Sequence, residues 1–148
     1  MEVRVQEQAL DPWRELAAGR QPLDGSFGGT AIFVGTMRDF NQGQGVERMT
    51  LEHYPGMTER YLREVCDEAA GRWELVDSLL VHRVGSVRPG DAIVLVAVWA
   101  VHRDAAFAAC RFIIDELKSR APFWKHEQTA TGLRWVAPEG PIDSGTGR

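Results

Sequence analysis

The sequence predicts a single α+β domain in which helices pack on an antiparallel or mixed sheet. Its 148 residues and 44% hydrophobic content suit one domain with a sizeable core. Segments with the period of strands alternate with segments that carry apolar residues at helical spacing. Residues 46–129 give the order β-α-β-β-α-β, which is the order of a ferredoxin-like core, and an extra strand is expected at each end of the chain.

The N-terminal region predicts an edge strand followed by a short helix. Residues 2–6 alternate weakly between apolar and polar side chains, which favours a strand. Asp11 then precedes Pro12, an N-cap followed by proline at the first helical position, so a helix should extend to about Ala18. Residues 19–25 are expected to form a loop.

Two strands separated by a loop are predicted next. Residues 27–35 are rich in β-branched and aromatic side chains, and their double glycine indicates a bulge or a close backbone approach. Residues 37–45 are polar and glycine-rich, as in a flexible loop. Residues 46–54 predict a second strand, which can pair with the first as a hairpin.

The middle of the chain predicts a helix and two further strands. Thr58 can cap the helix, whose apolar residues share one face, and Gly71 can end it. Residues 76–84 alternate as in a strand. Residues 92–101 are nearly all apolar and mostly β-branched, which is typical of a strand buried on both faces.

The last predicted elements are one helix and two short strands. Asp104 can cap the helix, and Pro122 marks its end. Residues 123–129 and 133–136 are expected to form the strands, which completes a single domain over residues 1–136. The tail, residues 137–148, is rich in proline, glycine and serine and is expected to be disordered.

Composition and charge exclude several classes of protein. The net charge of −4 disfavours a general nucleic-acid binder, which usually carries a basic excess. No signal peptide is visible, and the longest apolar run is about half of a membrane-spanning helix. Two distant cysteines form neither a disulfide framework nor a zinc motif. We therefore expect a cytoplasmic protein that binds neither nucleic acid nor membrane.

The segment Lys118–Glu127, KSRAPFWKHE, is the most unusual part of the sequence. Lys118 is expected in the last turn of a helix and Lys125 on the following strand, with Pro122 at the corner between them. Both amines can then point into one pocket, where cations beside aromatic rings bind an anion and an amine can act in acid–base or covalent chemistry. The alternative is that each lysine is a solvated surface charge.

The pair His102-Arg103 and the residue Arg38 are further candidates for binding a phosphate. The pair stands between the buried strand and a helix, whose N-terminus attracts anions. Arg38 opens the glycine-rich loop and suits a phosphate clamp, although the loop lacks the Lys-Ser/Thr of a P-loop. The alternative is a turn-capping role for His102 and solvated surface positions for Arg38 and Arg103.

Two other histidines and both cysteines are interpreted as structural. His53 and His82 lie among apolar neighbours without the spacing of a metal site, so neither a metal nor another cofactor is expected. Cys66 and Cys110 lie on inner helix faces, where cysteine behaves as a small hydrophobe. We therefore expect sulfur to travel on neither cysteine.

Several long motifs resemble the large, catalytic subunit of molybdopterin synthase. The resemblance extends from about Gly28 to Val136, and the joint order and spacing of the motifs make coincidence very improbable. The motifs that carry it are FVGTMRDFN (33–41), LEHYPGMTE (51–59), HRVGSVRPGD (82–91), VHRDAAF (101–107) and LKSRAPFWKHE (117–127).

The resemblance implies a fold, an activity and partners. The family has an α+β hammerhead-like domain and forms a dimer of large subunits. A small ubiquitin-like subunit, which ends in a Gly-Gly thiocarboxylate, docks at each end and makes a heterotetramer. Sulfur is transferred from that tail to cyclic pyranopterin monophosphate, which gives molybdopterin during molybdenum cofactor biosynthesis. The chain is therefore expected to be a sulfurtransferase.

The resemblance also assigns site residues one by one. The family's catalytic lysines match Lys118 and Lys125. The positions that match its substrate-binding residues are Thr36, Met37, Arg38, His102, Arg103, Lys118, Lys125, His126 and Glu127. Many relatives have lysine in place of Thr36 and arginine or lysine in place of His126, so weaker phosphate binding is expected here.

Three other functions remain open. The chain can be a non-catalytic dimeric scaffold of the same fold, although the retained Lys118 and Lys125 argue against it. It can be an RNA-binding module, although it lacks an RNP-like aromatic strand. It can be a sulfurtransferase that uses its own cysteine, which alkylation of Cys66 and Cys110 would test.

Overall fold

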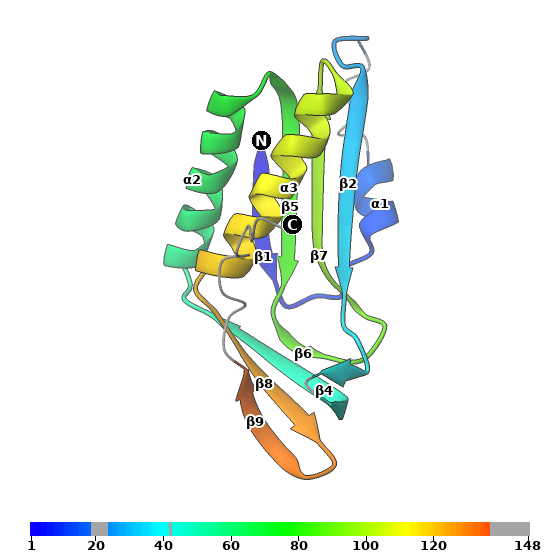
Figure 1. Ribbon diagram of the computed structural model, residues 1–148, viewed down its shortest axis with the longest axis vertical. Coiled ribbons are helices and arrows are strands. Elements are labelled where there is room, and N and C mark those ends of the chain that lie inside the picture. The colour runs from blue at the N-terminus through cyan, green and yellow to red at the C-terminus, as the bar shows by residue number, and fades with distance from the viewer. Residues whose placement is uncertain (19–23, 42, 137–148) are drawn as a thin grey trace, which may run out of the picture.

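A computed structural model describes residues 1–18, 24–41 and 43–136 of the chain. These residues form an α+β unit with two sheets and three helices (Figure 1). The tail predicted to be disordered, residues 137–148, lies outside the described residues, as do residues 19–23 of the predicted loop. In the described part of the chain, no helix is both long enough and apolar enough to cross a membrane.

The first sheet contains the predicted N-terminal and buried strands. Its order is β1 (Glu2–Gln6), β5 (Leu75–Arg83), β7 (Ala92–Ala100) and β2 (Gly29–Thr36). β1 runs parallel to β5, and the other neighbours are antiparallel. Seven consecutive residues of β7, from Val94 to Ala100, are buried, which confirms that this strand is covered on both faces.

The second sheet lies at one end of the first (Figure 1). β4 (Gln44–His53) pairs with β8 (Phe123–Thr129) on one side, and β8 pairs with β9 (Gly132–Val136). Two short strands that the sequence did not predict, β3 (Phe40–Asn41) and β6 (Gly85–Val87), also pair with β4.

Two predictions about strand pairing were wrong. The order β-α-β-β-α-β occurs, but β4 and β8 lie in one sheet while β5 and β7 lie in the other, so the ferredoxin-like core is not confirmed. β2 and β4 do not form a hairpin with each other, because β2 pairs with β7 along its whole length. The contiguous apolar face of β7 offers more buried surface than the polar β4 does.

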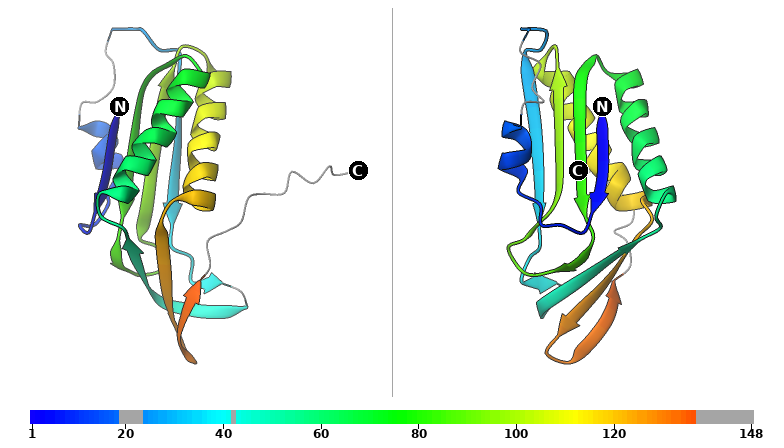
Figure 2. Two further views of the ribbon diagram at one scale, coloured as in Figure 1. Left: turned by 90° about the vertical axis from the view of Figure 1, so that its left-hand side faces the viewer. Right: turned by 180° about the vertical axis from the view of Figure 1, so that it is seen from behind.

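Helices cover both faces of the first sheet (Figure 2). α2 (Met57–Arg72) and α3 (Arg103–Arg120) cover one face and enclose the larger core, whereas α1 (Pro12–Ala17) covers the other face over a smaller core. Asp11 caps α1 as predicted, because its side chain accepts a hydrogen bond from the Arg14 backbone N–H at 3.1 Å. Thr58 and Asp104 are not the caps of α2 and α3, which begin after Gly56 and His102.

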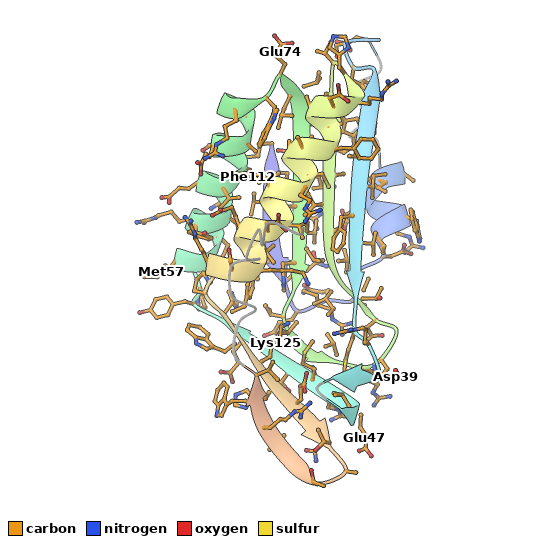
Figure 3. The ribbon with its side chains drawn as sticks, viewed as in Figure 1. Asp39, Glu47, Met57, Glu74, Phe112 and Lys125 are labelled. Carbon is orange, nitrogen blue, oxygen red and sulfur yellow. The ribbon has the colours of Figure 1, made fainter. Side chains whose placement is uncertain are left out.

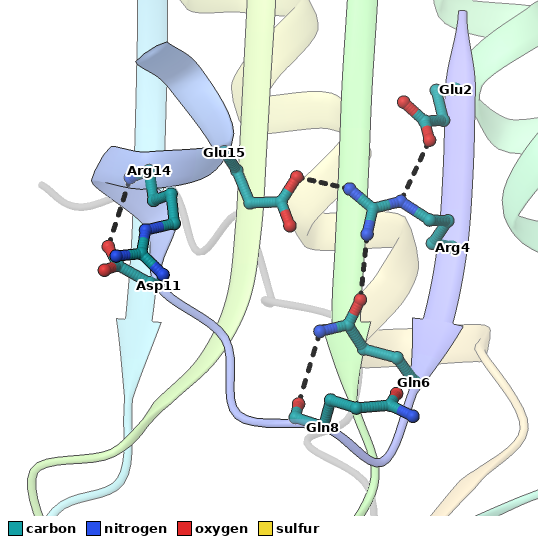
Figure 4. Close-up of polar contacts among 7 residues, drawn as sticks. All are labelled: Glu2, Arg4, Gln6, Gln8, Asp11, Arg14 and Glu15. Atoms are coloured by element: carbon teal, nitrogen blue, oxygen red, sulfur yellow. Dashed lines mark hydrogen bonds and ion pairs between the residues drawn. The ribbon is translucent and has the colours of Figure 1, made fainter. Parts of the chain in front are cut away.

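One ion pair joins α1 to β1, at the edge of the first sheet (Figure 4). The Arg4 guanidinium on β1 pairs with Glu15 on α1 and with Glu2 on its own strand, the latter at 2.9 Å. These carboxylates raise the pKa of Arg4. The contact spans β5, and Leu10 and Leu16 pack on the same face of the sheet against residues of β5 and β7.

The double glycine of the predicted strand 27–35 marks a close backbone approach. The Gly28 backbone N–H donates to the Ala100 carbonyl at 2.9 Å. A Cβ at Gly28 would lie 2.3 Å from the carbonyl oxygen of Val101. The register shift in β2 falls instead between Gly35 and Thr36.

We predict that Gly28→Ala lowers the free energy of unfolding by about 1–3 kcal/mol, because the strand must move to relieve the overlap. Gly71→Ala is the matched control. Outside the backbone of α2 itself, no atom lies within 4 Å of the place that its methyl group would take, so it should be neutral or stabilising by up to about 1 kcal/mol. Urea denaturation of both variants measures the difference, and equal stabilities would contradict the close approach.

Candidate active site

An open hollow lies at the end of the molecule where β2 leaves the first sheet. It has a volume of about 550 Å³ and is lined by Met37, Arg38, Asp39, Pro89 and Gly90. The Arg38 side chain is exposed there, whereas the Met37 side chain is buried in the larger core. Of the predicted segment Thr36-Met37-Arg38, the arginine and the exposed threonine can present polar groups to a ligand.

Backbone hydrogen bonds fix this segment to a turn at residues 88–91. The Met37 N–H donates to the Asp91 carbonyl at 2.9 Å, and the Gly90 N–H donates to the Met37 carbonyl at 2.8 Å. The Asp91 carboxylate accepts from the Arg88 N–H at 2.9 Å and pairs with Arg83 at 3.4 Å. The position of Arg38 therefore depends on the shape of this turn.

The two ends of α3 place the predicted cations far apart within one chain. α3 begins at the end of the first sheet farthest from the second sheet and ends beside β8 (Figure 1). His102 is the N-cap and Arg103 the first residue, while Lys118 lies in the last turn. At 1.5 Å per residue, Arg103 and Lys118 are roughly 22 Å apart along the axis. A single chain therefore does not bring His102 and Arg103 to the lysines.

A fixed corner separates Lys118 from Lys125. The buried hydroxyl of Thr58 donates to the Pro122 carbonyl at 3.2 Å and accepts from the Tyr54 N–H at 3.0 Å. This contact ties the start of α2 to the turn between α3 and β8. The predicted helix-proline-strand corner is confirmed, and Thr58 holds it instead of capping a helix.

The predicted site residues Lys125, His126 and Glu127 are consecutive in β8, so their side chains point to alternating faces of the second sheet. Half-buried Lys125 pairs with Leu51 and shares its face with Phe123 and Glu127, because side chains in a strand alternate. Figure 3 shows Lys125 at the same end of the molecule as Asp39. His126 faces the other way. There it packs against Trp135, and its Nε2 lies 3.9 Å from the Glu52 carboxylate.

Glu127 is engaged by a neighbouring cation. The residue is only 4% exposed, and one oxygen of its carboxylate accepts from Nε and Nη2 of Arg134 at 3.0 and 2.8 Å. Both residues lie on paired positions of β8 and β9. This ion pair joins β8 to β9 beside Lys125, and the Glu127 carboxylate is therefore already paired with Arg134.

His82 is a buried neighbour of this region that the sequence motifs did not assign to the site. Its ring stacks on Phe123 with centroids 4.0 Å apart and planes at 17°, and its Nδ1 lies 2.7 Å from the Arg83 carbonyl. Burial, opposed by that hydrogen bond and helped by the charges of Lys125 and His53, lowers the pKa of His82 to about 4. The ring is therefore neutral at pH 7.

The lysine content of the chain is a further signal for the site. The sequence contains two lysines, Lys118 and Lys125, against fifteen arginines. Both lysines flank the corner at the end of α3. All the other Lys/Arg positions carry arginine, and lysine differs from arginine in having a compact amine that can lose its proton.

A comparison with protein families shows to which family the chain belongs. A family model described as "MoaE protein" matches residues 5–120. The chain belongs to the MoaE family. A molybdopterin synthase catalytic subunit from Ralstonia nicotianae is 58% identical over 134 residues, which cover 90% of this chain and 76% of that protein.

Solved MoaE structures have the same fold. The molybdopterin biosynthesis MoaE protein from Burkholderia ambifaria superposes with a TM-score of 0.79 and 46% identity, covering 95% of this chain and 92% of that chain. A chain from the complex of subunits 1 and 2 of molybdopterin-converting factor from Helicobacter pylori matches with a TM-score of 0.75. That chain is 21% identical, and the match covers 93% of this chain and 92% of it, so it supports the fold alone.

The cysteines of this MoaE chain are poor nucleophiles. Cys66 and Cys110 are buried and free, and burial raises their thiol pKa values to about 12 and about 11. Their positions on inner helix faces confirm the sequence interpretation. Among the described residues, no group of three or more His, Cys, Asp or Glu side chains is arranged to hold a metal ion.

We predict that iodoacetamide at pH 7.5 leaves Cys66 and Cys110 unmodified in the folded protein, because the thiolate is the reactive form and both thiols are buried. In urea both should be alkylated. Intact-mass spectrometry measures the modification, and rapid labelling of either folded thiol would revive a mechanism in which sulfur travels on a cysteine.

We also predict a pH dependence of stability from His82. The unfolded chain takes up a proton near pH 6.5, whereas the folded chain resists it down to about pH 4. The stability that the neutral ring contributes to the folded state is therefore present above pH 6.5 and is lost as the pH falls towards 4. Between pH 7 and pH 5 the wild type should lose about 2 kcal/mol more than His82→Gln, which cannot titrate. Urea titrations at both pH values measure the difference, and parallel losses would contradict the buried neutral ring.

Proposed function

We propose that this chain is the catalytic subunit of molybdopterin synthase. It transfers sulfur from the thiocarboxylated C-terminus of a small ubiquitin-like subunit, which ends in Gly-Gly, to cyclic pyranopterin monophosphate. The product is molybdopterin, made during molybdenum cofactor biosynthesis. The observation that carries this proposal is the pair of lysines on either side of a fixed corner, in a member of the MoaE family.

Charge explains why this corner suits the two reactants. The thiocarboxylate tail and the substrate phosphate are both anionic. Lys118, Lys125 and Arg38 lie at the end of the molecule where the two sheets meet. Cations held there bring the two anions into contact, and holding reactants together in the reacting geometry supplies much of a rate enhancement.

The proposed mechanism gives each lysine a separate role. The thiocarboxylate sulfur attacks a side-chain carbon of the pterin, where a C–O bond breaks and the oxygen leaves with a proton. A thioester then links the pterin to the tail, and water can cleave it so that the sulfur stays on the pterin. Lys118 polarises the bond that breaks or transfers a proton, and Lys125 stabilises the developing charge and orients the phosphate. Water then releases the spent carboxylate tail. The presence of lysine at these two positions, in a chain otherwise rich in arginine, supports a requirement for an amine that titrates.

The substrate-binding set requires a second copy of the chain. His102 and Arg103 lie at the far end of α3 from Lys118, so they can join the same pocket only from a partner chain. A symmetric dimer in which the two α3 helices run in opposite directions supplies this pair to each pocket. Two small subunits then complete a heterotetramer, which we place in the cytoplasm.

The other substrate-binding positions are proposed to act in different ways. Arg38 binds the phosphate directly, and Thr36 and Met37 position it through the end of β2. Glu127 fixes the position of β8 beside Lys125 through its ion pair with Arg134. His126 points away from Lys125 in this chain, so it contributes through the opposite face of the second sheet. A non-catalytic dimeric scaffold of the same fold is the alternative function.

We predict that Lys118→Arg and Lys125→Arg each lower the rate of molybdopterin formation by about 10²–10⁴-fold, because arginine keeps the charge but cannot exchange the proton. The assay mixes each variant with thiocarboxylated small subunit and cyclic pyranopterin monophosphate. Arg120→Lys, in the turn of α3 that also carries Lys118, is the matched control and should remain near the wild-type rate.

Binding of the small subunit, measured by calorimetry, should be unchanged in these variants. Full activity of both lysine variants would reduce the role of the lysines to charge alone. A wild-type protein that binds the small subunit but forms no product would favour the scaffold function.

A further inference from the structure

The last two residues of β5, His82 and Arg83, stand between the two halves of the proposed site. They open the motif HRVGSVRPGD, for which the proposed function has no role. We propose that His82 and Arg83 are positioning residues: His82 supports the strand that carries Lys125, and Arg83 supports the turn that holds Arg38. This inference rests on the function proposed above. Because successive residues of a strand point to opposite faces, one dipeptide can support both.

His82 contacts β8 at its first residue. Its imidazole is 5% exposed and stacks on Phe123, with ring centroids 4.0 Å apart. Phe123 and Lys125 are two residues apart in β8, so their side chains leave the strand on the same face. The stack therefore fixes the height and tilt of the strand segment from which Lys125 projects.

The chemistry of His82 also suits a neighbour of a lysine. Its Nδ1 lies 2.7 Å from the Arg83 carbonyl, so in the neutral ring this nitrogen donates the proton and Nε2 carries the lone pair. The charge of Lys125 is close enough to disfavour protonation of this ring. A neutral ring therefore supports Lys125 without repelling its ammonium group.

Arg83 acts on the other half of the site through the turn at residues 88–91. Its guanidinium pairs with the Asp91 carboxylate at 3.4 Å and donates to the Ser86 carbonyl at 3.2 Å. The Asp91 carbonyl in turn accepts a hydrogen bond from the backbone N–H of Met37, which precedes Arg38. Arg83 thus bridges β6 to the turn at residues 88–91. The backbone of this turn holds the end of β2, where Arg38 borders the hollow.

We call the contact of His82 with Phe123 the first arm and the contact of Arg83 with Asp91 the second arm. The first arm acts on Lys125 and the second on Arg38, so matched variants should separate their effects. His82→Gln keeps the approximate size and loses the ring, whereas His82→Phe keeps the ring. Arg83→Met keeps the length and loses the guanidinium, whereas Arg83→Lys keeps the charge. The conservative variant of each pair should restore the property that the disruptive variant loses.

The first measurement needs no turnover. Reductive methylation with ¹³C-formaldehyde labels the two lysines and the terminal amine, and Lys118→Arg assigns the signals. We expect the Lys125 signal to move towards that of an exposed lysine in His82→Gln, to return in His82→Phe, and to stay in place in Arg83→Met. A Lys125 signal that is indifferent to His82→Gln would overturn the first arm.

Hydrogen exchange of the Met37 and Gly90 amides tests the second arm. Arg83→Met should speed exchange at both amides by about tenfold, because the turn that accepts and donates their hydrogen bonds loosens. Arg83→Lys should restore protection in part, and His82→Gln should leave it unchanged. Uniform loss of protection in both disruptive variants would mean a general packing role and would overturn the proposal.

Kinetics link the two arms to the proposed reaction. His82→Gln should lower kcat by about tenfold or more with little change in KM, because it misplaces a reacting group. Arg83→Met should mainly raise the KM for cyclic pyranopterin monophosphate. If the wild type formed no molybdopterin, the proposed function would fail, while the lysine signals and amide exchange would still decide whether His82 and Arg83 position the two cations.

Discussion

The burial of β7 on both faces is the constraint on which the rest of the structure depends. A strand without a polar face must be covered by helices on one side and by α1 with its loop on the other. It must also have strands on both edges, which β5 and β2 supply. α3 follows β7 directly and packs back along the sheet, so it starts at the end of the first sheet farthest from the second sheet and ends where the two sheets meet.

This arrangement puts the candidate site where the two sheets meet. α3 leaves the first layer at the corner held by Thr58, and the chain enters the second sheet as β8. β2 reaches the same end and is joined to the turn before β7. Lys118, Lys125 and Arg38 therefore lie on three different parts of the chain near this junction, at the end of α3, on β8 and just after β2.

Local patterns in the sequence were sufficient for most elements but not for their partners. The period of residues 2–6, the apolar run of β7 and the proline after α3 each act within a few residues, so the predicted elements lie close to the observed ones. The choice of β7 instead of β4 as the neighbour of β2 depends on surfaces that meet only after folding. The short strands β3 and β6 carry too few residues to show a period.

The same limit applies to the candidate site. The corner between Lys118 and Lys125 could be predicted because it spans one helix end, one proline and one strand. The distance from His102 to that corner depends on the direction of a whole helix relative to the sheet. The support from His82 and Arg83 depends on contacts of β5 with β8 and with the turn at residues 88–91, which no local pattern records.

The length of α3 has a further consequence for the proposed symmetric pair. In that proposed dimer, each pocket would take the last turn of one copy of this helix and the first turn of the other copy, so the length of the helix would set the spacing between the two pockets. Its 18 residues span about 27 Å. Inserting one residue in its middle would rotate Lys118 by about 100° relative to the N-terminal turn and, in that dimer, move the two pockets about 1.5 Å farther apart. In the proposed dimer, one change in the length of this helix would therefore alter both pockets at once.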